Sequence, residues 1–136
     1  VGCGACAAVC PRGALRIAGR EMTSEEAARR VAKNARALKM SGGGVTFSGG
    51  EARMQPDFVV ETRRLLPDLH AAIETSGYAD SAVFERVIKT MDLVLMDVKL
   101  ADPAAHKKWT GVDNRLILEN LRRLMALAFP SGRGCR

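Results

Sequence analysis

Residues 41–51, SGGGVTFSGGE, place a short apolar run between two clusters of glycine. The residues Val45, Thr46 and Phe47 favour a β-strand. Glycine permits a positive φ and lets other groups approach the main chain closely, and we expect a positive φ at Gly50. A strand that ends in Gly-Gly presents bare main chain at its tip, and the carboxylate of Glu51 follows at once. We therefore expect this tip to hold a small polar molecule.

Helical and strand patterns alternate along the rest of the chain. A capping-box pair, Thr23 and Glu26, opens a helix whose apolar spacing continues through Leu38 to the glycines at 42–44. The further elements expected are a helix from Pro56 to about 66, a strand at 70–77, a helix at 81–89, a strand at 93–99 and a helix at 114–127. This order predicts an α/β fold with a parallel sheet. The apolar run LVLMDVK at 93–99 is typical of a strand buried on both faces.

Polar residues end, or directly follow, each predicted strand. They form the sets 49–51 (GGE), 74–76 (ETS) and 97–99 (DVK). Each set alone could be structural, as a turn, a helix cap or an ion pair. Because ligands gather at the carboxyl ends of parallel strands, their joint occurrence favours one binding site. A dinucleotide site fits less well, since neither a G-x-G-x-x-G nor a P-loop lysine follows the strands.

Three of the four cysteines lie in CGACAAVCP, residues 3–11. The spacing C-x2-C-x3-C-P equals the last three members of the bacterial ferredoxin run, which binds iron–sulfur clusters. A zinc site or three ordinary thiols fit less well, because zinc would need a fourth ligand from the lone Cys135 or a distant histidine. We expect Cys3 and Cys6 to bind one 4Fe–4S cluster with a ligand that would precede the chain, and Cys10 to bind a second cluster.

The composition of the 136 residues is that of a soluble globular protein, with 47% hydrophobic and 26% charged residues. The net charge of +6 could suit nucleic acid, but aromatic residues make up only 4% and the basic residues are scattered along helical stretches. They are interpreted as a solvated surface, which an acidic protein partner could also use. With neither a membrane-spanning run nor a signal peptide in the sequence, we expect a cytoplasmic protein.

The cysteine run, followed in order by SGGGVTFSGGE, ETSGY and DLVLMDVKLADPAAHKKWTGVDN, resembles the glycyl radical enzyme activating enzymes, relatives of the pyruvate formate-lyase activating enzyme within the radical SAM superfamily. The resemblance covers about residues 1–126 and implies a partial (β/α)6 barrel with a ferredoxin-like segment. We accordingly expect residues 1–20 to be part of the ferredoxin-like 4Fe–4S segment and residues 21–136 to form three βα units of the barrel.

The resemblance also implies an activity. An activating enzyme reductively cleaves S-adenosylmethionine to a 5′-deoxyadenosyl radical and installs a glycyl radical on a partner enzyme such as pyruvate formate-lyase. A reducing flavodoxin or ferredoxin would supply electrons. The alternative is a non-enzymatic iron–sulfur electron-transfer protein, which would need the cysteines but not the polar strand ends.

Residue by residue, the resemblance assigns cofactor binding to Gly49, Gly50, Glu51, Glu74, Thr75, Asp97, Val98 and Lys99. The first three match the element that binds the amino group of the methionine part of S-adenosylmethionine. The last three match a segment at the same end, where Lys99 suits the methionine carboxylate. Glu74 and Thr75 match a position at which relatives hold that carboxylate, in some through a monovalent cation.

The chain departs from the family in two places. The radical-generating C-x3-C-x2-C motif does not occur in the sequence, so no catalytic residue is assigned, and we expect a fragment that is inactive alone. The tail AFPSGRGCR does not resemble the next strand of the barrel, and Cys135 within it is interpreted as an incidental thiol. The motifs do not identify the glycyl radical enzyme that is activated.

Overall fold

The structure, a computed structural model, describes residues 3–17 and 19–128. It has a mixed α/β fold around a three-stranded parallel sheet in the order β1-β2-β3. The strands are β1 (Gly44–Phe47), β2 (His70–Thr75) and β3 (Leu93–Met96). The predicted parallel sheet, with three strands in chain order and helices between them, is confirmed. The tail after residue 128, including Cys135, lies outside the described residues.

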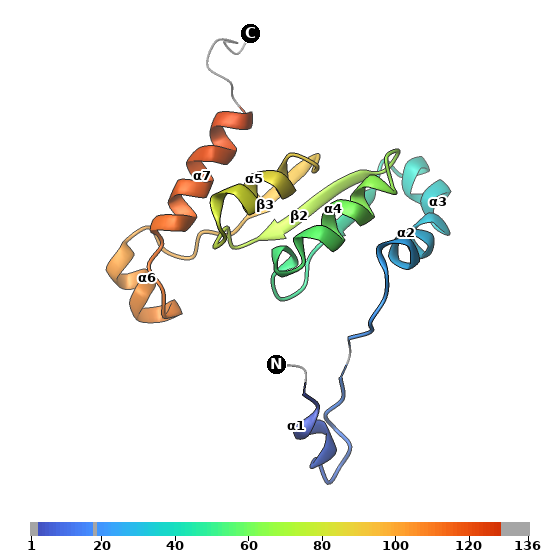
Figure 1. Ribbon diagram of the computed structural model, residues 1–136, viewed down its shortest axis with the longest axis horizontal. Coiled ribbons are helices and arrows are strands. Elements are labelled where there is room, and N and C mark those ends of the chain that lie inside the picture. The colour runs from blue at the N-terminus through green and yellow to red at the C-terminus, as the bar shows by residue number, and fades with distance from the viewer. Residues whose placement is uncertain (1–2, 18, 129–136) are drawn as a thin grey trace.

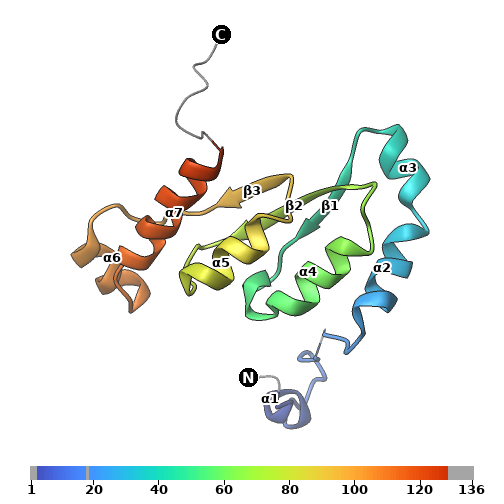
Figure 2. The same cartoon turned by 45° about the horizontal axis from the view of Figure 1, so that its top comes forward.

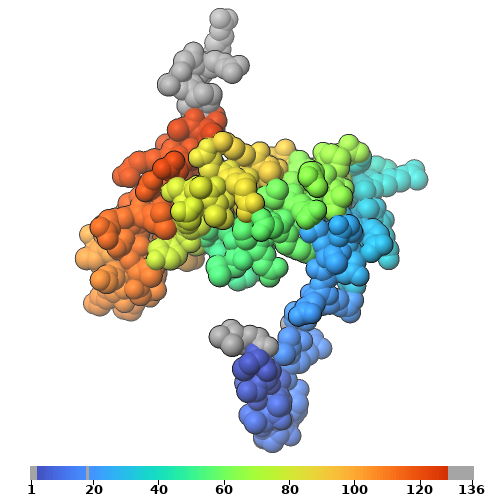
Figure 3. All heavy atoms as spheres, in the orientation of Figure 1, coloured from blue at the N-terminus to red at the C-terminus, as the bar shows by residue number. Residues whose placement is uncertain are grey.

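Helices cover one face of the sheet (Figures 1 and 2). The helices of the described residues are α1 (Ala5–Ala8), α2 (Ser24–Ala32), α3 (Ala35–Met40), the 3-10 helix η1 (Ala52–Met54), α4 (Pro56–Arg64), α5 (Ser81–Ile88), α6 (Pro103–Thr110) and α7 (Arg115–Ala128). Helices α4 and α5 lie over the sheet and run roughly along its strands, α2 packs beside α4, and α7 packs beside α5. The segment that contains α1 stands clear of this body (Figure 3). In the described part of the chain, no helix is long and apolar enough to cross a membrane.

The core lies between the sheet and the helices. Ile73 of β2 is fully buried and packs with Val59 of α4 and Val87 of α5. The parallel register aligns Ile73 with Phe47 and Val94, so the three strands present apolar side chains to the same helices. A second cluster joins α2 to the loop before β2 through Ala28, Leu66 and Leu69.

The opposite face of the sheet is open, which corrects the prediction for β3. The exposed fractions of Leu93 and Leu95 are both 46%, so this strand is not buried on both faces. The register places Leu95 beside Glu74, which is also exposed, on the side away from α4 and α5. An apolar run alone cannot reveal that β3 is the last strand of this sheet and that one of its faces has no cover among the described residues.

Two helical predictions also differ from the structure. The single helix expected from Thr23 to Leu38 is divided into α2 and α3, because Asn34 leaves helical geometry (φ −106°, ψ 4°) and bonds three residues back, to the carbonyl of Val31. The capping box of Thr23 and Glu26 is present as predicted. Helix α6 was not predicted, although Asp102 caps its start and Gly111 ends it with a φ of 87°.

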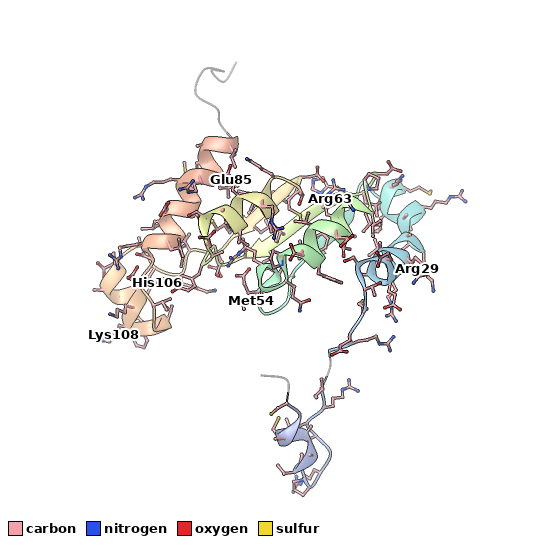
Figure 4. All side chains as sticks on the ribbon, in the orientation of Figure 1. Arg29, Met54, Arg63, Glu85, His106 and Lys108 are labelled. Carbon is pink, nitrogen blue, oxygen red and sulfur yellow. The ribbon has the colours of Figure 1, made fainter. Side chains whose placement is uncertain are left out.

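The amino-terminal ends of the strands are closed by polar contacts. Arg63, at the end of α4 (Figure 4), donates hydrogen bonds to the carbonyl oxygens of Leu66 and Thr90 and pairs with Asp92. The Asp92 carboxylate also accepts from the N–H of Ala71 at 2.8 Å. These contacts hold β2 and β3 at one end, which leaves the carboxyl ends of the strands free to build a site.

Candidate functional site at the strand ends

The carboxyl ends of all three strands meet around one groove of about 340 Å³. Its lining residues are Ser48, Gly49, Gly50, Glu51, Glu74, Thr75, Ser76, Asp97 and Lys99. The N–H of Asp97 donates to the carbonyl of Thr75 at 2.9 Å, which extends the pairing of β2 and β3 to the tip. The prediction that Gly50 and Asp97 lie at the same end of the sheet is confirmed.

Glu51 joins the tip of β1 to the tip of β2. Its carboxylate accepts hydrogen bonds from the Thr75 hydroxyl at 2.9 Å, from the Ser76 N–H at 3.0 Å and from the Ser76 hydroxyl at 2.7 Å. The Nε of Arg53 lies 3.1 Å from the same carboxylate and donates to the Thr75 hydroxyl at 2.7 Å. Because the Arg53 side chain is only 3% exposed, this is a nearly buried ion pair. The turn after β1 is therefore fixed to β2 before any ligand binds.

These contacts also set the charge of Glu51. Partial burial raises the pKa of the carboxyl group, but the hydrogen bonds from Ser76 and Thr75 and the charge of Arg53 outweigh it and lower the pKa overall. Glu51 is thus ionised at neutral pH. Its negative charge lies beside the main chain of Gly49 and Gly50.

The two glycines leave the main chain of the turn accessible. Gly49 has a φ of 125°, in the region that side chains disfavour. Gly50 does not have a positive φ, so the expectation of one at this position is wrong and the conformational requirement falls on Gly49 instead. A Cβ placed on either glycine would meet no other atom within 4 Å. The space over both residues is open to a ligand.

Charged groups of both signs lie on the other side of the groove. Glu74, Asp97 and Lys99 are exposed, and the Lys99 ammonium pairs with the Asp97 carboxylate. The Ser48 hydroxyl donates to Glu74. A groove with carboxylates, an ammonium group and accessible glycine main chain suits a ligand that carries a cation and an anion close together, such as the zwitterionic end of an amino acid.

The structure brings together most of the predicted site residues and adds others. Val98 is half-buried and does not line the groove. Ser48 and Ser76 do line it but were not assigned a binding role, although each is a hydroxyl residue beside glycine at a strand end. Arg53 was missed because nothing in the local sequence distinguishes it from the exposed arginines of neighbouring helices.

The cysteine segment lies apart from this groove. Cys3 and Cys6 are exposed, Cys10 is half-buried, and none of the three is in a disulfide. The N–H groups of Arg12, Leu15 and Ala14 lower the pKa of the Cys10 thiol, which favours a thiolate that can bind metal. In residues 3–17 and 19–128, no group of three or more His, Cys, Asp or Glu side chains is assembled to hold a metal ion.

Comparison with known proteins identifies the family. Residues 2–135 match the radical SAM superfamily. The isethionate sulfite-lyase activating enzyme of Nitratidesulfovibrio vulgaris is 41% identical over 92% of this chain, and the 4-hydroxyphenylacetate decarboxylase activating enzyme of Clostridium scatologenes is 41% identical over 88%. The chain spans 41% and 38% of the lengths of these two relatives.

A solved structure agrees with both sequence matches. The crystal structure of a domain of the pyruvate-formate lyase-activating enzyme from Bacteroides vulgatus superimposes with a TM-score of 0.53 at 36% identity. The superposition covers 60% of this chain and 52% of that one. The chain therefore belongs to the radical SAM superfamily, and within that superfamily it is similar to glycyl radical enzyme activating enzymes.

Proposed function

We propose that the groove at the strand ends binds the methionine end of S-adenosylmethionine. The observation that carries this proposal is the convergence of three strand ends on one groove with open main chain on one side and charges of both signs on the other. The carbonyl groups of Gly49 and Gly50 would accept from the ammonium group, with the charge of Glu51 behind them. Lys99 would pair with the carboxylate.

Glu74, Thr75 and Asp97 complete the proposed site. The carboxylates of Glu74 and Asp97 are exposed at the groove, and a monovalent cation between them and the ligand would balance their charge. Lys99 would then have to leave its present partner, Asp97, or share it. Val98 lies in the same segment and would contribute packing below the groove rather than a polar contact.

In the proposed reaction, one electron from a reduced 4Fe–4S cluster would cleave bound S-adenosylmethionine to methionine and a 5′-deoxyadenosyl radical, which would take a hydrogen atom from a glycine of the partner enzyme and become 5′-deoxyadenosine. The described residues contribute to this by binding and orienting the ligand. The ion pair of Glu51 and Arg53 keeps the turn rigid, so little ordering remains for the ligand to impose. Since the chain spans only part of its relatives, we propose that it does not perform the reaction alone.

The cysteine segment is proposed to bind 4Fe–4S clusters, Cys3 and Cys6 on one and Cys10 on a second. The exposure of Cys3 and Cys6 and the lowered pKa of Cys10 are compatible with thiolate ligands. A reducing flavodoxin or ferredoxin in the cytoplasm would deliver electrons there. The partner that receives the radical would be a glycyl radical enzyme. The relatives are named for an isethionate sulfite-lyase and a 4-hydroxyphenylacetate decarboxylase, which are two examples of such partners.

One experiment distinguishes the proposed activating enzyme from the alternative, a non-enzymatic iron–sulfur electron carrier. The gene product that contains this chain is reduced with dithionite, mixed with S-adenosylmethionine and analysed for 5′-deoxyadenosine. An activating enzyme forms 5′-deoxyadenosine, and Gly50→Val reduces the yield. A protein that takes up electrons without forming any 5′-deoxyadenosine would be a carrier.

A further inference from the structure

Two fully buried asparagines of the α7 region bond to the loops that follow β2 and β3. The Nδ2 of Asn120 donates to the carbonyl oxygens of Gly77 and Ala79, both at 2.8 Å. The Nδ2 of Asn114, directly before α7, donates to the carbonyl oxygens of Leu100 and Ala101, both at 2.8 Å. Each side chain has an exposed fraction of 0%.

The orientation of both amides is determined by these contacts. In each case the NH₂ group faces two carbonyl oxygens, so a flipped amide would place oxygen against oxygen. The Oδ1 atoms of both residues have no hydrogen-bond partner within the part of the chain that the structure describes. A buried amide oxygen without a hydrogen-bond partner is destabilising, so packing alone does not explain these two asparagines. Each of them does fix one loop through two hydrogen bonds.

The anchored loops begin at the groove. Gly77 comes directly after Ser76, and its N–H donates to the Thr75 hydroxyl at 3.1 Å. Ser76 in turn bonds to the carboxylate of Glu51. On the neighbouring strand, Leu100 comes directly after Lys99. Asn120 of α7 is therefore connected, through the loop after β2, to Ser76 and Glu51. Asn114, directly before α7, is connected to Lys99 through the loop after β3.

We propose that Asn114 and Asn120 are positioning residues that hold the loops after β2 and β3 so that Ser76 and Lys99 keep their places in the groove. This inference rests on the proposed function, because it takes the groove beside the two loops to be the binding site for the methionine end of S-adenosylmethionine. Neither asparagine touches the groove itself. Both act from behind it, through backbone carbonyls.

The test uses Asn120→Ala and Asn114→Ala with Ile117→Ala as the matched control. Ile117 lies on the same helix with an exposed fraction of 3%, but its side chain makes no hydrogen bond to either loop. NMR relaxation of backbone ¹⁵N measures loop motion in the free chain, and titration with S-adenosylmethionine measures affinity. Should an alanine variant fail to fold, the serine variant at the same position, which keeps a shorter donor, replaces it.

We expect Asn120→Ala to loosen residues 76–79 and Asn114→Ala to loosen residues 98–101, each without the other. Both should weaken binding by about tenfold or more, since two hydrogen bonds that preorganise the site are lost. Ile117→Ala should lower the thermal midpoint without either effect. Unchanged affinity in a variant with a loosened loop, or an equal loss in Ile117→Ala, would overturn the positioning role.

The relaxation measurement needs no ligand, which separates this inference from the proposed function. If the wild-type chain binds no S-adenosylmethionine, the proposed function fails and the assignment of the loops to that ligand fails with it. If binding occurs but neither loop loosens in the asparagine variants, the positioning inference fails while the proposed function stands.

Discussion

Replacement of Glu51 by alanine should destabilise the protein far more than the loss of an ordinary surface carboxylate. The substitution leaves the guanidinium of Arg53, whose side chain is 3% exposed, without a counter-charge and removes the acceptor for Ser76 and Thr75. Removal of one partner from a buried ion pair costs about 3–5 kcal/mol. Because the Glu51 side chain is 19% exposed and water can partly replace it, we expect about 3 kcal/mol.

Urea unfolding followed by circular dichroism measures this loss. Trp109 is a poor fluorescent probe, since its exposed fraction is already 73% in the folded state. Glu61→Ala is the control, because its pair with Arg64 is solvent-exposed and should be worth less than about 1 kcal/mol. The double variant Glu51→Ala/Arg53→Met removes both charges and should be less destabilised than the sum of the single variants by about 1–3 kcal/mol. A loss of under about 1 kcal/mol for Glu51→Ala would show that Glu51 does not compensate a buried charge on Arg53.

Three further outcomes are expected. Despite partial burial, hydrogen bonds and the charge of Arg53 hold the folded-state pKa of Glu51 below its ordinary value of 4.5, so ionised Glu51 stabilises the folded state above that pH. This stabilisation is lost as the pH falls through the folded-state pKa. The free energy of unfolding, measured against pH, should therefore fall more steeply in acid for the wild type than for Glu51→Gln. Gly44→Ala should lower the free energy of unfolding by about 1–3 kcal/mol, since its Cβ would overlap the carbonyl oxygen of His70, whereas Gly50→Ala, with free space around its Cβ, should stay within about 0.5 kcal/mol. Because Leu93 and Leu95 are exposed on the open face of the sheet, we expect the chain to self-associate through that face, and Leu95→Lys should reduce the self-association in sedimentation experiments; an unchanged sedimentation profile would contradict this.

Much of the fold follows from local signals in the sequence. The capping box at Thr23, the proline that opens α4 and the β-branched residues of β1 each determine an element by themselves. The alternation of elements then determines a parallel sheet, and a parallel sheet brings its strand ends together. This is why most residues of the groove could be assigned without coordinates.

The parts that the sequence did not reveal depend on contacts between distant residues. The exposure of Leu95 is decided by what lies over the sheet, not by the apolar run that contains it. Arg53 is buried because Glu51 and Thr75 surround it, and no spacing rule indicates that. Likewise, the asparagines at 114 and 120 look like a helix cap and a helix surface residue until their amides are seen against the loops after β3 and β2.

The most direct test of the central claim is an NMR titration of the ¹⁵N-labelled chain with S-adenosylmethionine. We expect the amides of residues 48–51, 74–76 and 97–99 to shift together with a single dissociation constant. We also expect Gly50→Val, which keeps the fold but fills the space over the turn, to weaken binding by about tenfold or more. Shifts confined to other parts of the chain, or an equal affinity of Gly50→Val and wild type, would contradict the claim that this groove holds the methionine end.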